Sequence, residues 1–249
     1  MSDSAPGRTR WFRRVALAAA ASPLLAGVLV RAQGPDRDGS IAGTVTVPNA
    51  GKPQSLRVTT DVEYCGRTLP SEAVLATAEG RLANAVVYLD LASPKPGQTP
   101  PGTVLVRNEQ CRFVPHVQAA LAGATVTLTN DDPLLHNVHF FLHLNGQRRT
   151  VANLALPGKV PRLDASRAAR RPGLIEVRCD AHEWMTGWIL LLDHQYFALT
   201  DKQGRFTIPD VPPGTYTMRV WHEALGELRQ EVVVRVGQVA QVSLRFGSS

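Results

Sequence analysis

Short apolar runs, many of them rich in β-branched residues, recur along the chain and are separated by turn-forming residues. Within 124–129, Val126 and Leu128 alternate with threonines, a period of two that is typical of strands. After Gly34 almost no segment follows the helical period. The pattern predicts an all-β protein built as sandwiches or barrels. The runs cover residues 41–47, 82–91, 124–129, 174–177, 188–192, 205–208, 215–221, 228–236 and 239–246.

The N-terminal segment departs from this pattern. Four arginines lie in 8–14, an apolar stretch follows at 15–30, and small residues then allow cleavage before Gln33. The apolar stretch is shorter than the roughly 20 residues of a membrane-spanning helix. Residues 1–32 are therefore predicted to be a signal peptide, which implies a periplasmic or extracellular protein. The alternative is an uncleaved membrane anchor.

Residues 144–173 lack a clear strand pattern and carry many arginines, so they are predicted to form a long irregular loop. A loop of this length in a compact domain is usually functional or mobile. Both a docking face and a solvated surface loop fit the pattern. The basic residues are Arg148, Arg149, Lys159, Arg162, Arg167, Arg170 and Arg171.

Composition and charge narrow the functional classes. The 249 residues are 44% hydrophobic and 19% charged, which is typical of a globular protein. The formal net charge is +6, but residues 1–32 contain five arginines and one acid, so about +2 remains without them. The sequence therefore gives little support to nucleic-acid binding.

Two turn motifs mark the C-terminal region. Residues 200–208 place an Asp-x-x-Gly turn before a strand, and residues 210–216 place Pro-Pro-Gly before another. This region resembles the carboxypeptidase-regulatory-like (transthyretin-like) β-sandwich. That family opens with a Gly-x-Val strand and a strand of small residues and valines, which stand far upstream here, at 41–45 and 84–89.

The resemblance therefore implies a sandwich that is interrupted by an insertion. The predicted division is 39–99 for its first part, 100–193 for an inserted domain and 194–249 for the remainder. The Pro- and Gly-rich segment 94–102 fits a linker into the insertion. The alternative is two consecutive domains that meet near residue 195.

The residues that carry chemistry stand between two predicted strands, as Cys179, His182 and Met185. A thiolate, an imidazole and a thioether on one loop are ligands suited to copper. Two histidines and one cysteine with a weak axial methionine form the blue-copper arrangement. His136, in the sequence His-Asn-Val after a predicted strand, supplies the second histidine.

Residues 103–193 resemble the cupredoxins, the family of amicyanin and plastocyanin. The resemblance is carried by Phe-Val-Pro at 113–115, by the Gly-Ala-Thr-Val strand that ends in Asn130, and by His-Asn-Val at 136–138. The Cys-x-x-His-x-x-Met spacing at 179–185 matches the short ligand loop of the amicyanin type.

The resemblance implies one mononuclear type 1 copper site. His136, Cys179 and His182 would be the equatorial ligands and Met185 the axial one. Asn137 would tie the two ligand loops together. The alternatives are a zinc-loaded site, a domain that has lost its metal, and a site in which His139 is a ligand. His116 is interpreted as structural or exposed, and His194 and His222, in the other sandwich, as satisfied by neighbouring groups.

Two cysteines remain outside this ligand set. Cys65 and Cys111 can pair in an oxidising compartment, which would leave Cys179 free for a metal. The sequence therefore predicts a disulfide between them.

The function predicted from these residues is one-electron transfer without catalysis. No haem-attachment, zinc-protease, phosphate-loop or nucleophile-elbow motif is present. The expected partner is a redox protein such as a cytochrome or a periplasmic oxidoreductase, with a membrane involved only if the N-terminal segment is uncleaved. By analogy with cupredoxins, this partner would dock around an exposed His182, with Trp184 in an apolar rim and the arginines of 148–171 steering it. The alternatives are a copper carrier or sensor and a structural binding module.

Overall fold

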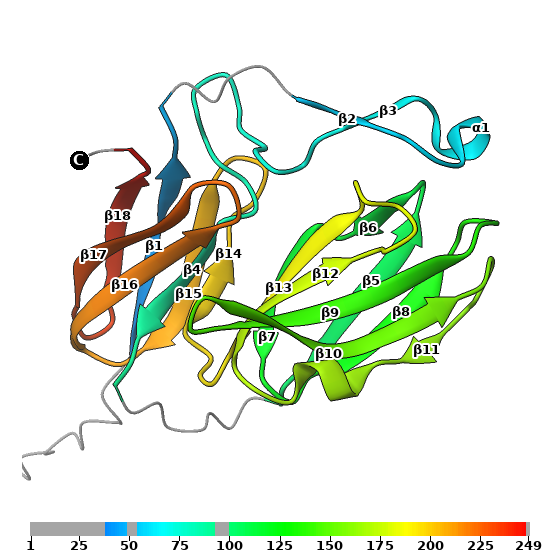
Figure 1. Cartoon of the computed structure of the whole chain (residues 1–249). Coiled ribbons are helices and arrows are strands. Elements are labelled where there is room, and N and C mark those ends of the chain that lie inside the picture. Colours follow the sequence, from blue (N-terminus) through cyan, green and yellow to red (C-terminus); the bar gives the residue numbers. More distant parts are fainter. Residues whose placement is uncertain (1–37, 49–53, 93–99, 248–249) are drawn as a thin grey trace, which may run out of the picture. The chain divides into compact units, whose positions relative to one another are not determined.

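The computed structural model describes residues 38–48, 54–92 and 100–247 (Figure 1). The predicted signal peptide, 1–32, lies outside the described residues. Strands dominate the described part, and its helices are the single turns α1 (Val62–Cys65) and η1 (Ser166–Ala169). No helix there has the length and hydropathy needed to cross a membrane. The all-β prediction is confirmed.

One sandwich is built from both ends of the described chain. A three-stranded sheet has the order β15-β1-β18 and a four-stranded sheet has the order β14-β4-β16-β17. Their apolar residues form a common core, with Ile41, Leu89 and Met218 almost fully buried. The strands are β1 (Gly39–Thr46), β4 (Val86–Asp90), β14 (Phe197–Leu199), β15 (Arg205–Val211), β16 (Gly214–His222), β17 (Gly226–Val234) and β18 (Val239–Arg245). We call it the terminal sandwich.

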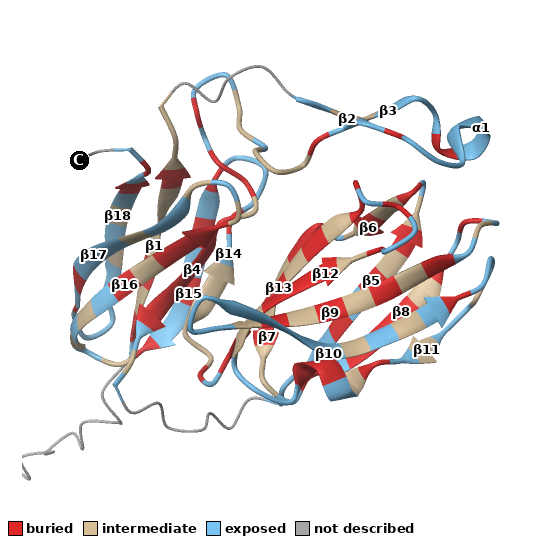
Figure 2. Ribbon diagram, viewed as in Figure 1, coloured by how far each residue is buried: buried red, intermediate tan, exposed pale blue. Residues whose placement is uncertain are grey.

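The other sandwich is built from the strands between β4 and β14. A five-stranded sheet has the order β10-β9-β12-β13-β7, and a four-stranded sheet has the order β11-β8-β5-β6. The strands are β5 (Thr103–Glu109), β6 (Arg112–Val114), β7 (Val117–Leu121), β8 (Thr125–Asn130), β9 (His136–Leu144), β10 (Gln147–Leu156), β11 (Leu163–Asp164), β12 (Gly173–Arg178) and β13 (Thr186–Leu192). We call it the central sandwich; Figure 2 shows buried residues alternating along its strands.

The strand pairing shows how the two sandwiches share the chain. Strand β4 pairs with β14, with Tyr88 opposite Phe197, and β1 runs parallel to β18. Strands β5 to β13 pair only with one another in the described part of the chain. This pairing supports the division into 39–99, 100–193 and 194–249, which we retain as a proposal.

Residues 55–70 lie outside the paired strands of both sandwiches. They contain β2 (Ser55–Arg57), α1 and β3 (Thr68–Pro70), and among the described strands β2 pairs only with β3 (Figure 1). Val58 and Cys65 are buried in the core of the central sandwich, and Leu56 and Leu69 pack against it. We call residues 55–70 the strap. Although the predicted division assigns them to the first part of the terminal sandwich, their apolar side chains pack against the central one.

The prediction of an irregular loop over residues 144–173 is wrong for much of that segment. Strand β10 occupies Gln147–Leu156 and pairs with β9 along the whole strand. Its first five residues are exposed, because β10 is an edge strand. Polar and charged side chains are common on such edges, where they prevent pairing with other chains. A polar edge strand therefore lacks the apolar pattern by which strands are recognised.

A buried ion pair joins residues of the two sandwiches. The His116 ring bonds Glu223 through Nε2 and the carbonyl of Thr186 through Nδ1. Trp188 also donates to Glu223, at 2.8 Å. The interpretation of His116 as a structural residue therefore fits its surroundings.

Candidate metal centre

His136 begins β9, and the loop before it is held by one asparagine side chain. The amide Nδ2 of Asn130 lies 2.8 Å from the carbonyl of Leu134, 3.0 Å from that of Leu156 and 2.9 Å from that of Pro157. One buried amide thus ties the end of β8 to both ends of the β9–β10 hairpin. These bonds fix the position at which His136 enters the sheet.

Cys179 and His182 lie on the short loop between β12 and β13. The backbone N–H of Met185 donates to the carbonyl of His182 at 2.8 Å, and that of Cys179 donates to the carbonyl of Met185 at 3.3 Å. These bonds close the loop on itself. Cys179 and His182 are each only 1% exposed, so the loop directs both side chains inward.

Three donor atoms meet at one buried point. Nδ1 of His136 lies 3.0 Å from Nδ1 of His182, and Sγ of Cys179 lies 4.0 Å from the first nitrogen and 3.5 Å from the second. The point that is equidistant from the three atoms lies about 2.1 Å from each of them. This is close to ordinary metal–nitrogen and metal–sulfur distances of roughly 2.0–2.3 Å. In the described part of the chain, this is the one group of side chains that we find arranged to hold a metal ion.

The donor set suits copper or zinc. Imidazole nitrogens bind both metals, and a thiolate sulfur selects soft or borderline ions over magnesium and calcium. Both histidines present Nδ1 to the common point, because each Nε2 is bonded to a carboxylate. A hydrogen bond of this kind fixes the tautomer and the orientation of a metal-binding ring. The residues therefore fit the metal that the sequence predicts.

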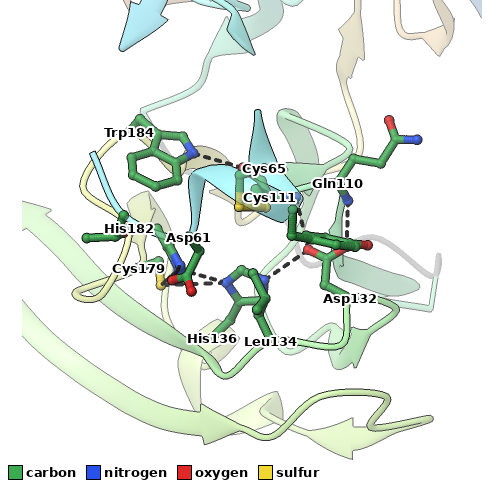
Figure 3. Close-up of a disulfide and its surroundings, with 12 residues drawn as sticks. Asp61, Cys65, Gln110, Cys111, Asp132, Leu134, His136, Cys179, His182 and Trp184 are labelled. Atoms are coloured by element: carbon green, nitrogen blue, oxygen red, sulfur yellow. Dashed lines mark hydrogen bonds and ion pairs between the residues drawn. A yellow bond between two sulfur atoms is a disulfide. The ribbon is translucent and has the colours of Figure 1, made fainter. Parts of the chain in front are cut away.

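Asp132 is the carboxylate partner of His136. Its Oδ2 lies 2.9 Å from Nε2 of His136, and Figure 3 shows the ring between this carboxylate and the pair Cys179–His182. Asp132 also accepts the backbone N–H groups of Gln110 at 2.7 Å and Cys111 at 2.9 Å. One carboxylate thereby connects a candidate ligand to the turn between β5 and β6.

Asp61, from the strap, is the carboxylate partner of His182. Its Oδ2 lies 2.9 Å from Nε2 of His182, across 121 residues of sequence. The side chain of Asp61 is 46% exposed, whereas that of His182 is 1% exposed. The expectation that His182 lies exposed at a docking rim is therefore wrong, because the strap covers it.

Trp184 is likewise no exposed rim residue. It is 9% exposed, and its indole N–H donates to the carbonyl of Cys111 at 3.2 Å. Cys111 is bonded to Cys65 of the strap, with Sγ atoms 1.97 Å apart and Cα atoms 5.6 Å apart. The disulfide predicted from the sequence is present, and Cys179 is the cysteine left free.

The electrostatics of the group follow from its close contacts. Burial acts to lower the pKa of His136, but the hydrogen bonds to Asp132 and Cys179 raise it to about 9. Burial acts to raise the pKa of Cys179, yet the hydrogen bond to His136 and its other bonds lower it to about 7. A thiol that ionises near neutral pH provides the thiolate that a metal needs.

The other predicted site residues occupy defined positions. Asn137 Oδ1 accepts the backbone N–H of Asp180 at 2.7 Å and the thiol of Cys179 at 3.4 Å, so it links β9 to the ligand loop. Met185 is 1% exposed and belongs to the same core as Cys179. Its role as the axial ligand stays a prediction.

His139, the alternative ligand, lies outside the group. Its Nδ1 is 3.0 Å from Asp180 Oδ1 and its Nε2 is 2.9 Å from Thr150 Oγ1. It is three residues after His136 on β9, and its side-chain hydrogen bonds are to the exposed residues Asp180 and Thr150. His194 and His222, in the terminal sandwich, each accept a backbone N–H two residues on.

The sequence pointed to neither carboxylate partner. Asp132 stands four residues before His136, and an acid at that spacing in a ligand loop is a signal that can be sought. Asp61 has no local signal. Only the predicted disulfide, which brings Cys65 to Cys111, places the strap near the ligand loops.

Comparisons with known proteins gave one family model and a set of solved structures. The family model, polysaccharide lyase family 4, domain II, matches residues 174–242. This match spans the end of the central sandwich and most of the remainder of the chain, and it leaves the transthyretin-like resemblance untested. No curated protein sequence matches the chain.

The similar solved structures include copper proteins. A purple cupredoxin from Nitrosopumilus maritimus is 22% identical, with 36% of this chain and 99% of that chain covered and a TM-score of 0.30. Amicyanin from Paracoccus versutus is 18% identical, with 43% and 97% covered and a TM-score of 0.30. A copper-containing nitrite reductase from Thermus scotoductus is 20% identical, with 42% and 25% covered and a TM-score of 0.29.

Proposed function

We propose that this chain is an exported protein that holds one copper ion in a type 1 site and carries single electrons. His136, Cys179 and His182 are the equatorial ligands and Met185 is the weak axial one. The observation that carries the proposal is the convergence of two Nδ1 atoms and one thiol sulfur on a buried point. This is the donor set of blue-copper sites.

The chain's own residues keep this donor set rigid. A bound copper ion supplies the one-electron redox step. Asn130 fixes the loop before His136, and Asn137 fixes the loop that carries Cys179. Ligands held by a β scaffold move little when the charge of the metal changes, which favours rapid electron transfer without any bond chemistry in the protein.

Export and the type of partner are parts of the same proposal. A structural disulfide such as Cys65–Cys111 is typical of oxidising compartments, which supports a periplasmic or extracellular location. The proposed partner is a redox protein, such as a cytochrome or a periplasmic oxidoreductase. No catalytic function is proposed for this chain, because the described donor set is explained by electron transfer alone.

The test is a spectrum of the copper-loaded protein. We would express the full chain in a bacterium, purify the exported form, load it with Cu(II) and record absorption and EPR spectra beside a Cys179→Ser variant. An intense thiolate-to-copper band, absent from the variant, is expected. A colourless wild-type protein with ordinary wide copper hyperfine splitting would overturn the proposal.

Matched histidine variants sharpen this test. His136→Ala should abolish the band, whereas His139→Ala, three residues along the same strand, should retain it.

The copper-loaded wild-type protein also distinguishes an electron carrier from the alternative of a copper carrier or sensor. An electron carrier keeps its metal through repeated oxidation and reduction, whereas a metal carrier releases copper in one oxidation state.

A further inference from the structure

Four contacts hold the strap over the metal centre. Thr60 Oγ1 donates to the carbonyl of Ala181 at 3.4 Å, Asp61 bonds His182 at 2.9 Å, and Tyr64 donates to Asp132 Oδ1 at 2.9 Å. The Cys65–Cys111 disulfide follows directly. These contacts come from residues 60–65 and reach both loops that carry the candidate ligands.

The backbone at Asp61 is shaped for this contact. Asp61 precedes α1 and has a φ of 48°, in the left-handed region that aspartate tolerates better than most residues. Its side chain does not cap α1, and its carboxylate bonds the ring of His182 instead. Asp61 therefore fits the left-handed turn before α1, and its carboxylate faces the metal centre.

We propose that the strap is a cover of the metal centre, and that Asp61 is the positioning residue through which it closes over His182 and tunes that ligand. This inference rests on the proposed function. It adds that the second histidine faces a carboxylate of this chain instead of solvent or a partner protein.

The charge of Asp61 gives the cover an electronic effect. A carboxylate that accepts the remote N–H of a metal-binding imidazole makes the ring a stronger donor. A stronger donor stabilises Cu(II) relative to Cu(I), because the oxidised ion carries the higher charge. His136 has the same kind of partner in Asp132, so both rings are held in this way. Removal of either carboxylate is therefore expected to raise the reduction potential.

Closure can be measured without any metal. Cys179 is the one free cysteine of a chain that has three, and it is 1% exposed. Its rate of alkylation by iodoacetamide in the metal-free protein therefore reports how often the centre opens. We would compare the wild type with Asp61→Asn and Asp61→Ala. The control is Glu63→Gln, which removes an exposed acid from the same strap.

The expected results separate Asp61 from Glu63. Alkylation of Cys179 should be at least tenfold faster in Asp61→Ala than in the wild type and unchanged in Glu63→Gln. In the copper form, Asp61→Asn should shift the Cu(I)/Cu(II) equilibrium about tenfold toward Cu(I), which corresponds to a potential about 59 mV higher for one electron. Mass mapping of the intact disulfide and circular dichroism would establish that each variant is folded.

The outcomes distinguish this inference from the proposed function. Wild-type rates of alkylation in both Asp61 variants would overturn the role of Asp61 in closing the site, and an unchanged potential in Asp61→Asn would overturn its electronic effect. If the wild type shows no thiolate-to-copper band, the proposed function fails, and the alkylation rates alone decide whether Asp61 closes the site.

Discussion

His136 and Asp132 form a buried pair in which the ring nitrogen Nε2 lies 2.9 Å from a carboxylate oxygen and neither side chain is more than 2% exposed. The two residues are four positions apart, on either side of the entry into β9. The pair orients the ring so that Nδ1 faces Cys179. The same carboxylate holds the turn at Gln110 and Cys111, so the candidate ligand and the disulfide share one anchor.

The first prediction concerns Asp132→Asn. The amide cannot accept the same set of bonds as a charged carboxylate, so metal affinity should fall by roughly 10–100-fold, as for other partners of metal-binding histidines. Isothermal titration with Cu(II) or Zn(II) in competition with a chelator would measure the change. Asp131→Asn, which alters an exposed neighbour, is the matched control and should bind like the wild type.

Asp132 also predicts how the stability of the metal-free protein depends on pH. Burial acts to raise its pKa, but the hydrogen bonds from His136 and the backbone of Cys111 lower it to about 2. A folded-state pKa below the unfolded value stabilises the fold above about pH 4, and the gain is lost as the pH falls toward 2. Urea unfolding should show Asp132→Asn to be destabilised by on the order of 2 kcal/mol at pH 6, with the difference shrinking on acidification. A constant difference between pH 6 and pH 3 would contradict this assignment.

The disulfide gives a second stability prediction. Cys65 and Cys111 are 46 residues apart, and a cross-link that closes a loop of this size is worth about 4 kcal/mol in the chain-entropy model. The double variant Cys65→Ser, Cys111→Ser should lose most of this stability in urea unfolding. The double variant and the disulfide-containing reference protein should both carry Cys179→Ser, so that no free thiol can exchange with the disulfide. A loss below about 1 kcal/mol would show that packing alone holds the strap.

Asn137 is expected to affect both the thiol of Cys179 and, by a small amount, the stability of the fold. In Asn137→Ala the backbone N–H of Asp180 and the thiol of Cys179 lose their common acceptor. The free energy of unfolding should fall by about 1 kcal/mol, and the thiolate-to-copper band should shift. Asn153→Ala is the control, because Asn153 bonds the side chains of Asn137 and Asp180 without touching Cys179. Equal spectra for the two variants would remove Asn137 from the site.

The pair His116–Glu223 predicts a pH dependence outside the metal centre. Burial acts to lower the pKa of His116, but the bond to Glu223 raises it overall, and the bond from His116 lowers the pKa of Glu223 against the effect of burial. The histidine contribution is full below its unfolded pKa and is lost as the pH rises through the folded one, whereas the glutamate contribution is lost on acidification. Glu223→Gln should therefore lower the free energy of unfolding most between about pH 4.5 and 6.5. The loss expected for a broken buried pair is roughly 3–5 kcal/mol. Thermal unfolding at pH 5.5 and pH 9 would measure this, and a larger cost at pH 9 would contradict it.

The sequence predicted the strands with buried, regularly spaced apolar residues, such as β8 and β16, because burial imposes their pattern. It did not predict β10, whose exposed edge is polar. The candidate ligands were recognisable because soft donors are uncommon and their spacing on one loop is specific. The contact between Asp61 and His182 depends on tertiary structure across 121 residues, and no local pattern encodes it.

The strap belongs by sequence to the part of the chain that precedes the central sandwich. A fragment of residues 100–193 would retain His136, Cys179 and His182 but would lack Asp61, Tyr64 and Cys65. Cys111 would then carry an unpaired thiol in place of its disulfide. The candidate metal-binding part is therefore incomplete on its own: recombination that moved residues 100–193 alone would transfer the three candidate ligands without Asp61 and without the disulfide partner of Cys111.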